Sequence, residues 1–483
     1  MRLKSLPFLS ILCALLAGAP APAQQDTLKL SLDQSVALAL EHHLGLHSAR
    51  LSQQLQERSV VQEELRFGRS LTANLSNRSN HAPSISDLEK VKTSTSSSVG
   101  MGLGLAQQLV TGGRLNLDFS NNRSSSNAAF NLINPVYSSG VSLSFNQPLL
   151  QGRGKVNRIG LRVARNALSA SQMSVEGQAQ DLRAQVSGAY WDLFLSLQNL
   201  QLREQFLAGA QRVLETAKVR AEVGSDPATN ILQAEVGVAQ RQQDIVNAQA
   251  SLRQTEDQLK TLLGLDQDPQ RLPLPLRPTD TPELQSFTGD PETGLAKTLA
   301  FNPAYRRAEL DLKNADLQIA LAHDQTRPTL NLNTQVGLSG TGATYSDDMS
   351  GIKGADGRSW VGAVSLDFPL GQTSAKERVQ QRLIEKQQRQ LSLEQLRLQL
   401  AQQVRNQHRQ VETSRQREQA AGWTERLAEQ SLTELEERLN LGLSTVRQVL
   451  DAQDDLSQAR LSRLQAVVDY NKALIEWRRL TGE

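Results

Sequence analysis

Residues 186–214 read VSGAYWDLFLSLQNLQLREQFLAGAQRVL, and this stretch decides the fold. An apolar residue recurs at every seventh position, at Val186, Leu193, Leu200, Leu207 and Leu214. A second strict seven-residue series follows at Ile231, Val238, Ile245, Leu252 and Leu259. Seven residues is the period of helices that pack along a shared apolar seam. The two series therefore predict long amphipathic helices.

The placement of proline shows how long these helices can be. Proline costs ~3 kcal/mol in a helix interior, and none occurs between Pro148 and Pro227 or after Pro369. The two proline-free regions predict two helical hairpins, with arms at 156–222 and 228–264 and at 374–440 and 445–480. At about 1.5 Å per residue, each long arm would measure ~100 Å.

A short turn separates the two arms of each predicted hairpin. The first turn is Gly224-Ser225-Asp226-Pro227, and the second is Gly442-Leu443-Ser444-Thr445. Glycine suits the position just after a helix, and Ser or Asp can cap the helix that follows.

The same order of elements occurs twice along the chain. A medium helix, expected over 32–67 and again over 293–326, leads to strand-like segments, a proline, a long helix, a glycine turn and a short helix. Pro148-Leu149 corresponds to Pro369-Leu370, and Gly224 corresponds to Gly442. We therefore expect two structural repeats, 24–268 and 292–483, joined by a stiff proline-rich connector at 269–291.

Two regions between the helices, 69–148 and 327–369, alternate apolar and polar residues. Their apolar members are Leu71/Ala73/Leu75, Met101/Leu103/Leu105, Leu115/Leu117/Phe119, Val141/Leu143/Phe145, Leu330/Leu332 and Val364/Leu366/Phe368. Such alternation over about 10 residues, between Ser, Asn and Gly loops, is typical of outer-membrane strands. We expect four strands in the first half and two in the second. A soluble β-sheet cap is the alternative interpretation.

The composition excludes several function classes. Lys and Arg number 52 and Asp and Glu number 50, so the net charge is +2 and gives no reason to expect a nucleic-acid partner. The single cysteine, Cys13, excludes a disulfide scaffold, a zinc ribbon and a thiol nucleophile. No stretch of about 20 apolar residues follows the N-terminal segment, which excludes transmembrane helices.

The N-terminus has the form of a secretory signal peptide. Basic residues precede an apolar run, 6–16, and the small residues Ala21-Pro22-Ala23. We expect a signal peptide at 1–23 that is cleaved after Ala23; the alternative is a buried N-terminal helix. Leu12 precedes Cys13 where a lipoprotein signal has a small residue, so we expect no lipid anchor.

A single copy of this chain leaves two packing problems. Six strands cannot close a useful barrel, and an open sheet in a membrane has unpaired edges. Long helical arms also have little core unless they pack against copies. Both problems disappear if several chains share one barrel and one helical tube with a polar lining. The pattern favours a passive duct that is not an enzyme and needs no cofactor.

The second turn and the segment after it, Gly442-Leu443-Ser444-Thr445-Val446-Arg447-Gln448-Val449-Leu450-Asp451-Ala452-Gln453, resemble the TolC-like outer-membrane efflux proteins. So do Asn146-Gln147-Pro148-Leu149-Leu150, the following Gly152-Arg153-Gly154 and the duplicated order of elements. The resemblance covers nearly all of residues 30–482. It implies a mainly α fold with a membrane β-barrel part, in which duplicated helical hairpins form a trimeric α-barrel tunnel joined to a shared trimeric β-barrel.

The resemblance also implies a location and partners. The protein would be a homotrimer in the bacterial outer membrane, with a helical tunnel in the periplasm. It would work with a periplasmic adaptor (membrane fusion) protein and an inner-membrane efflux pump or ABC-type transporter. The cargo, small molecules or polypeptides, stays open. One strand hairpin in each half is typical of the family, so four strands per chain remain the alternative to six.

The resemblance places a periplasmic gate at the hairpin tips. Its acidic positions correspond to Gln448 and Asp451, and its polar links between hairpins correspond to Asn230 and Ser444. Only Asp451 is charged, so we expect a closed state with few ionic contacts, in which Asp451 forms a three-fold ring. The alternative for Asp451 is a solvated surface charge. The expected adaptor-docking tips are Val223, Gly224, Ser225, Leu441, Gly442 and Leu443.

Other motifs point to chemistry more weakly. His43 and His47 are four residues apart and could face one metal ion on a helix, but no third ligand is evident and no metal site is expected. Gly100, Gly102 and Gly104 alternate with apolar residues, which favours a strand over a dinucleotide loop.

Two other functions compete with the duct. The main alternative is a secreted coiled-coil structural or adhesion protein with a β-rich cap, and lipid-facing alternation on every strand would distinguish the two. A metal-dependent periplasmic hydrolase that uses His43 and His47 is the weaker one.

Overall fold

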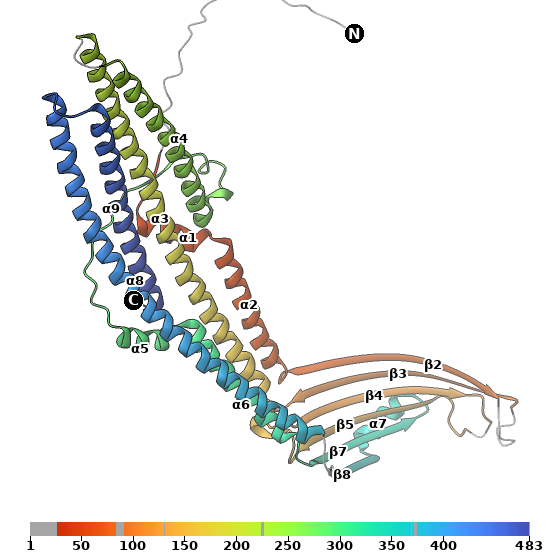
Figure 1. The fold of residues 1–483 in the computed structure, drawn as a ribbon. Coiled ribbons are helices and arrows are strands. Elements are labelled where there is room, and N and C mark those ends of the chain that lie inside the picture. Colours follow the sequence, from red (N-terminus) through yellow and green to blue (C-terminus); the bar gives the residue numbers. More distant parts are fainter. Residues whose placement is uncertain are drawn as a thin grey trace, which may run out of the picture. The chain divides into compact units, whose positions relative to one another are not determined.

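The computed structural model describes residues 27–83, 91–129, 131–223, 227–368, 370 and 374–482. The expected signal peptide, 1–23, lies outside these residues. The first half contains β1 (Leu28–Leu30), α1 (Leu32–His42), α2 (Leu44–Leu65), β2 (Arg69–Pro83), β3 (Thr93–Gln108), β4 (Arg114–Ser126), β5 (Val136–Pro148), η2 (Gly154–Arg158), α3 (Ile159–Glu222), α4 (Thr229–Leu263) and η3 (Leu265–Gln267). The connector contains β6 (Leu276–Pro278). The second half contains α5 (Pro291–Phe301), α6 (Pro303–Asp324), β7 (Thr329–Gly342), α7 (Tyr345–Gly354), β8 (Gly357–Asp367), α8 (Ser374–Asn440) and α9 (Val446–Thr481) (Figure 1).

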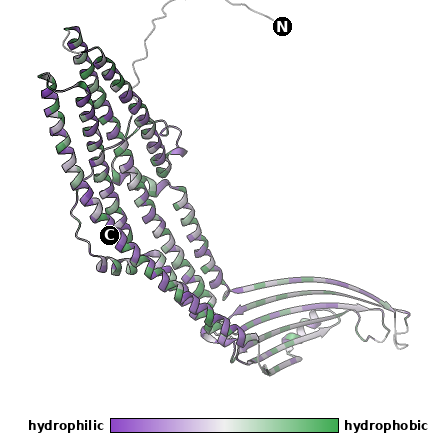
Figure 2. Ribbon diagram, in the orientation of Figure 1, coloured by the Kyte–Doolittle hydropathy of each residue, from purple (hydrophilic) through white to green (hydrophobic). Residues whose placement is uncertain are grey.

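The four long helices follow from the apolar periodicity and from the absence of proline. α3 has 64 residues, α8 has 67, α4 has 35 and α9 has 36. In Figure 2 hydrophilic and hydrophobic residues are interspersed along them, as expected for amphipathic helices. α4 ends at Leu263, and the φ of 70° at the following Gly264 lies in the left-handed region that suits glycine after a helix.

Each predicted medium helix is in fact two helices. The single helix expected over 32–67 is interrupted at His43, which has an extended backbone between α1 and α2. The helix expected over 293–326 is interrupted at Asn302, because Pro303 disfavours a helical conformation in the residue before it. The Asn302 side chain then caps α6 by accepting a hydrogen bond from the N–H of Tyr305, at 3.1 Å.

The described residues form two compact units, and each takes segments from both halves of the chain. Unit 1 consists of the described residues within 1–43, 185–284 and 414–472. Unit 2 consists of those within 44–184, 285–413 and 473–483. α3, α8 and α9 contribute to both units, so the compact units do not coincide with the repeats inferred from the sequence.

The buried Tyr190 connects the short strands of unit 1 to α3. Its hydroxyl accepts hydrogen bonds from the backbone N–H groups of Thr279 and Asp280, each at 3.1 Å. It also lies 3.1 Å from the carbonyl oxygen of Leu30. β1 and β6 pair in parallel beside it, so one side chain of α3 holds the end of β1 and part of the proline-rich connector.

Unit 2 contains a six-stranded antiparallel sheet in the order β2-β3-β4-β5-β7-β8. Four strands come from the first half of the chain and two from the second, so the prediction of six strands is confirmed and the alternative of four is wrong. Thr111, Gly112 and Gly113 lie in the turn that joins β3 to β4, and Gly112 has a φ of 97°. The periodicity gave no indication of α7, which lies between β7 and β8.

No helix among the described residues is both long enough and apolar enough to cross a membrane.

Candidate functional site

The second hairpin tip, between α8 and α9, is a tight and exposed turn. The N–H of Gly442 donates to the carbonyl of Leu439 at 3.0 Å, and that of Leu443 donates to the carbonyl of Arg438 at 2.8 Å. This pair of bonds ends α8 in a Schellman motif, with Gly442 at a φ of 77°. Leu441 and Leu443 are each 74% exposed. Two apolar side chains therefore project into solvent at this tip.

The first hairpin tip is described only in part. Val223 is 73% exposed, and α4 begins at Thr229. Gly224 and Ser225, the other expected docking residues of this tip, lie outside the described residues. The residue before α4 is Ala228, which has no capping side chain, so the expected Ser or Asp cap does not stand at this helix start.

The gate candidates near the second tip have different roles. Gln448 and Thr445 form a capping box, since the Thr445 N–H donates to Gln448 Oε1 at 2.9 Å and the Gln448 N–H donates to Thr445 Oγ1 at 3.3 Å. The Ser444 hydroxyl donates back to the carbonyl of Leu435 at 3.1 Å. Both side chains thus hold the turn itself.

Asp451 lies one turn further along α9 and is open to solvent. Its carboxylate is 3.8 Å from the guanidinium of Arg447, and both side chains are more than two-thirds exposed. Asn230 lies on α4, in the other hairpin, and the described residues show no hydrogen bond between it and Ser444, Gln448 or Asp451. The structure therefore groups Ser444 and Gln448, and leaves Asp451 and Asn230 apart from them.

Arg241 provides a link between the hairpins that the sequence analysis did not identify. Its side chain is 6% exposed, and its Nη2 donates to the Asp454 carboxylate of α9 at 2.8 Å. It also donates to the carbonyls of Gly237 at 3.1 Å and Leu450 at 3.4 Å. A buried arginine on α4 therefore binds α9 at two points within one turn of Asp451.

The charges around Asp454 act on one another. Its partial burial raises the pKa of the Asp454 carboxyl above its ordinary value, and the guanidinium of Arg241 opposes that rise. The carboxylates of Asp451 and Asp244 raise this pKa further by repulsion. Asp244 is itself paired with Arg203 of α3, at 2.9 Å. Asp451 thus belongs to a network of two arginines and three aspartates near the tip.

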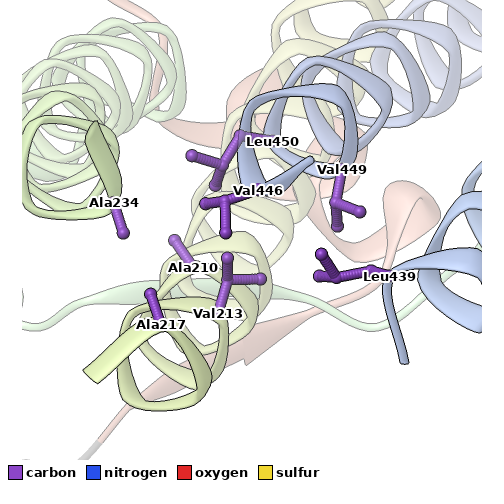
Figure 3. Close-up of a cluster of buried hydrophobic side chains, with 8 residues drawn as sticks. All are labelled: Ala210, Val213, Ala217, Ala234, Leu439, Val446, Val449 and Leu450. Carbon is purple, nitrogen blue, oxygen red and sulfur yellow. The ribbon is translucent and has the colours of Figure 1, made fainter. Parts of the chain in front are cut away.

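A cluster of buried apolar side chains lies beside this network. Its members come from all four helices of the two hairpins: Ala210, Val213, Ala217, Ala234, Leu439, Val446, Val449 and Leu450. Figure 3 shows these side chains pointing toward one another from α3, α4, α8 and α9. Arg220 of α3 also donates to the carbonyl of Leu439 at the end of α8. Apolar packing and arginine hydrogen bonds together hold the hairpins side by side.

The six-stranded sheet has two chemically different faces. Because successive residues of a strand alternate between faces, each row of register partners shares one face. One row, typical of what we call the apolar face, is Ala73, Leu103, Phe119, Val141, Leu338 and Arg358. A neighbouring row, typical of the polar face, is Asn74, Gly102, Ser120, Gly140 and Ser339.

The apolar face is exposed. Trp360 is 82% exposed, Leu75 is 81%, Leu71 is 76% and Val364 is 65%. The polar face is lined by glycine and by short side chains that lie over it: a Cβ at Gly102 would be 2.2 Å from Asn74 Oδ1. An exposed apolar face of this extent requires lipid or another protein against it.

Comparison with known proteins agrees with this geometry. The family model described as "Outer membrane efflux protein" matches residues 114–265 and 294–483. The chain belongs to the outer membrane efflux protein family. This membership confirms the resemblance to TolC-like proteins that was inferred from the sequence of the second tip.

Two curated relatives of this family member are similar over about two thirds of their length. The outer membrane efflux protein BepC of Brucella suis is 23% identical over 332 residues, which cover 68% of this chain and 69% of BepC. The pyoverdine export outer membrane protein OpmQ of Pseudomonas putida is 27% identical over 337 residues, which cover 65% of this chain and 67% of OpmQ.

Solved structures of outer-membrane channels share the fold of this family member. The CmeC channel of Campylobacter jejuni has a TM-score of 0.71 at 14% identity and covers 99% of this chain and 94% of its own. The open MtrE channel of Neisseria gonorrhoeae has a TM-score of 0.67 at 18% identity and covers 93% of this chain and 88% of its own. The expected combination of an α-barrel part and a β-barrel part is thereby confirmed as the fold class.

The histidine pair considered as a metal site is not on one helix. His43 follows α1 in an extended conformation, whereas His47 lies in α2. Within the described ranges, no group of three or more His, Cys, Asp or Glu residues could hold a metal ion.

Proposed function

We propose that this outer-membrane efflux family member is one protomer of a homotrimeric, passive duct that crosses the outer membrane and the periplasm. The apolar face of its sheet would contact lipid, and the polar face would line the lumen. The helical hairpins would continue the lumen through the periplasm. The duct carries out no catalysis and requires no cofactor.

The observation that carries this proposal is the open, two-faced sheet. Six strands present an exposed apolar face and a polar face, and β2 and β8 are its two edges. An unpaired strand edge is costly within a bilayer, and barrel closure removes it. Cyclic symmetry would pair β2 of one copy with β8 of the next, so that every edge is satisfied.

The hairpin tips are the proposed gate. Arg241 and Asp454 hold α4 against α9, and Asp451 would face its two copies around the three-fold axis. Movement of one hairpin away from the other would break the Arg241 contacts and widen the ring of Asp451 carboxylates. Gln448, Ser444 and Asn230 would support the closed state through uncharged contacts, with Gln448 and Ser444 also holding the turn.

The exposed tips are the proposed docking site for a periplasmic adaptor protein. Leu441 and Leu443 on one tip and Val223 on the other supply apolar surface, and Gly442 keeps the turn narrow. Gly224 and Ser225 complete the proposed set. The adaptor would connect the duct to an inner-membrane efflux pump or ABC-type transporter. The relative OpmQ is a pyoverdine export outer membrane protein, which makes small molecules the first cargo class to test.

The proposed route to the outer membrane begins with the signal peptide at 1–23, cleaved after Ala23, without lipid attachment. Mass spectrometry of the mature protein tests this part, because it would find Gln24 at the N-terminus and no acyl mass.

Planar-bilayer recording of the purified full-length protein tests the duct itself. We expect discrete single-channel steps from a particle with the mass of three chains. A protein that stays monomeric in detergent, or that never conducts, would contradict the proposal.

A further inference from the structure

α7 (Tyr345–Gly354) packs directly against the backbone of the sheet. It lies against β7 and β5 (Figure 1). Two glycines of β7 allow this close approach. A Cβ on Gly340 would come within 1.9 Å of the Asp348 carbonyl oxygen, and one on Gly342 within 2.6 Å of Asp347 Cβ. The two glycines of β7 therefore leave the space into which this helix packs.

A buried carboxylate fixes α7 in that position. Asp348 has no exposed surface. It accepts a hydrogen bond from the Ser139 N–H at 2.9 Å, another from the Ser139 hydroxyl, and a third from Asn121 Nδ2 at 3.2 Å. A buried charge is stable only with such partners. The donors lie on β5 and β4, so one side chain holds α7 to two strands.

The strand register identifies the face on which α7 lies. Asn121 and Ser139 are register partners, and so are Ser139 and Gly340. These three residues are each two positions beyond Phe119, Val141 and Leu338, which form a row of the apolar face. A step of two residues keeps a side chain on the same face. α7 therefore lies on the apolar face, next to the row that contains Phe119, Val141 and Leu338.

The side of α7 that points away from the sheet is polar. Asp348 and Gly351 are buried beneath the helix, whereas Ser346, Ser350 and Lys353 are exposed. Such a surface does not suit acyl chains, but it suits lipid headgroups, and a lysine suits their phosphates.

Aromatic and cationic residues gather at this end of the apolar face. Arg123 lies over the ring of Tyr137 at 5.9 Å, and Arg358 is exposed on β8 beside the exposed Trp360. A girdle of this kind marks the level at which a barrel leaves the hydrocarbon layer.

We propose that α7 is an external interfacial helix: it lies on the outside of the barrel, in the headgroup layer of the outer leaflet, and leaves the outer mouth of the duct uncovered. This inference rests on the proposed function, which makes the apolar face the lipid-facing one. It assigns the β7–β8 connection a role in positioning the barrel in the membrane instead of one in closing the pore.

Single-cysteine variants test this placement. In a Cys13→Ser background, which lacks native cysteine, Ser350→Cys would label the exposed side of α7, and Ser120→Cys would label the polar face of β4. Bulky maleimide on Ser350→Cys should leave single-channel conductance unchanged, whereas the same reagent on Ser120→Cys should reduce it. A nitroxide on Ser350→Cys should report the depth of lipid headgroups.

The outcomes separate the placement from the duct. Conductance that falls on labelling of Ser350→Cys, or a nitroxide that reports bulk water alone, would overturn the external position of α7 while the duct stands. Absence of conductance in the unlabelled protein would overturn the duct and this placement together. Asp348→Ala adds a second check: it should speed the motion of the Ser350→Cys nitroxide severalfold without changing conductance, and unchanged motion would show that Asp348 does not hold the helix.

Discussion

The guanidinium of Arg241 and the carboxylate of Asp454 lie 2.8 Å apart and join α4 of the first hairpin to α9 of the second. Arg241 is buried, whereas Asp454 remains 63% exposed and faces the repulsion of Asp451 and Asp244. Arg241 and Arg203 together offset the three carboxylates of this network. Separation of the two hairpins would break the contact between Arg241 and Asp454.

Replacing Arg241 by alanine should loosen the gate. The contact between α4 and α9 is expected to lose about 1.5 kcal/mol of stabilisation. This is the low end for hydrogen bonds to charged groups, because Asp454 is screened by solvent. Single-channel conductance in a planar bilayer should rise. Arg438→Ala is the matched control, since its pair with Glu434 lies within α8 and both side chains are exposed. Equal conductance in the two variants would show that Arg241 is not part of the gate.

Replacing Asp451 by alanine tests the proposed acidic ring. Loss of three carboxylates at the constriction should raise single-channel conductance and reduce the preference for cations, measured as a shift in reversal potential across a salt gradient. Arg447→Ala removes the partner of Asp451 and keeps the carboxylate, so it should retain cation preference. If Asp451→Ala changes neither conductance nor selectivity, Asp451 is a solvated surface charge.

The pKa of Asp454 gives the tip a pH dependence with a defined sign. Because the folded protein raises this pKa above the ordinary value of about 3.9, the neutral form favours the folded tip. The stabilisation of the tip by the neutral Asp454 carboxyl is complete below about pH 4 and is lost as the pH rises through the raised pKa. Hydrogen exchange at α9 should therefore show protection that increases on acidification in the wild type. The increase should be smaller in Asp454→Asn, and an identical pH dependence would argue against the assignment.

Gly442→Ala should destabilise the second tip. The φ of 77° costs an alanine about 1 kcal/mol, so hydrogen exchange at the end of α8 should accelerate severalfold. Gly422→Ala, in the interior of the same helix, meets nothing closer than Arg463 Nε at 3.7 Å and should slow exchange instead. Two effects of the same sign would contradict this account of the turn.

Tyr190→Phe should release part of the connector. The backbone N–H of Asp280 would lose its acceptor at a cost of about 1–3 kcal/mol, whereas the N–H of Thr279 would keep the carbonyl oxygen of Leu30. Limited proteolysis between residues 279 and 290 should become faster. Tyr305→Phe is the control, because the described residues show no hydrogen bond to the Tyr305 hydroxyl. A cleavage rate in Tyr190→Phe equal to that of the control would mean that other contacts hold the connector.

The long helices and the six strands were predictable because their periods extend over many residues. The break at Asn302 could have been read from Pro303, whereas the break at His43 has no comparable signal. α7 was missed because ten residues with two adjacent aspartates, Asp347 and Asp348, show no clear apolar face. Its position depends on a buried carboxylate that only tertiary structure reveals.

The candidate site was predictable only in part. The seven-residue series predicted Ile231, Val238 and Ile245 as the seam of α4, but the buried positions there are three residues further on, at Ala234, Arg241 and Ala248. Leu259 of the same series is buried as predicted. An arginine between two alanines at this spacing was the available signal for the link to α9. Asp454 carried none, because its role depends on which hairpin lies beside it.

Electron microscopy of the full-length protein, extracted from outer membranes in mild detergent, tests the central claim most directly. We expect a three-fold particle with a hollow helical stalk, in which each copy contributes six strands to one closed barrel whose apolar face points outward. Solid rods, a soluble monomer, or a barrel closed within a single chain would contradict it.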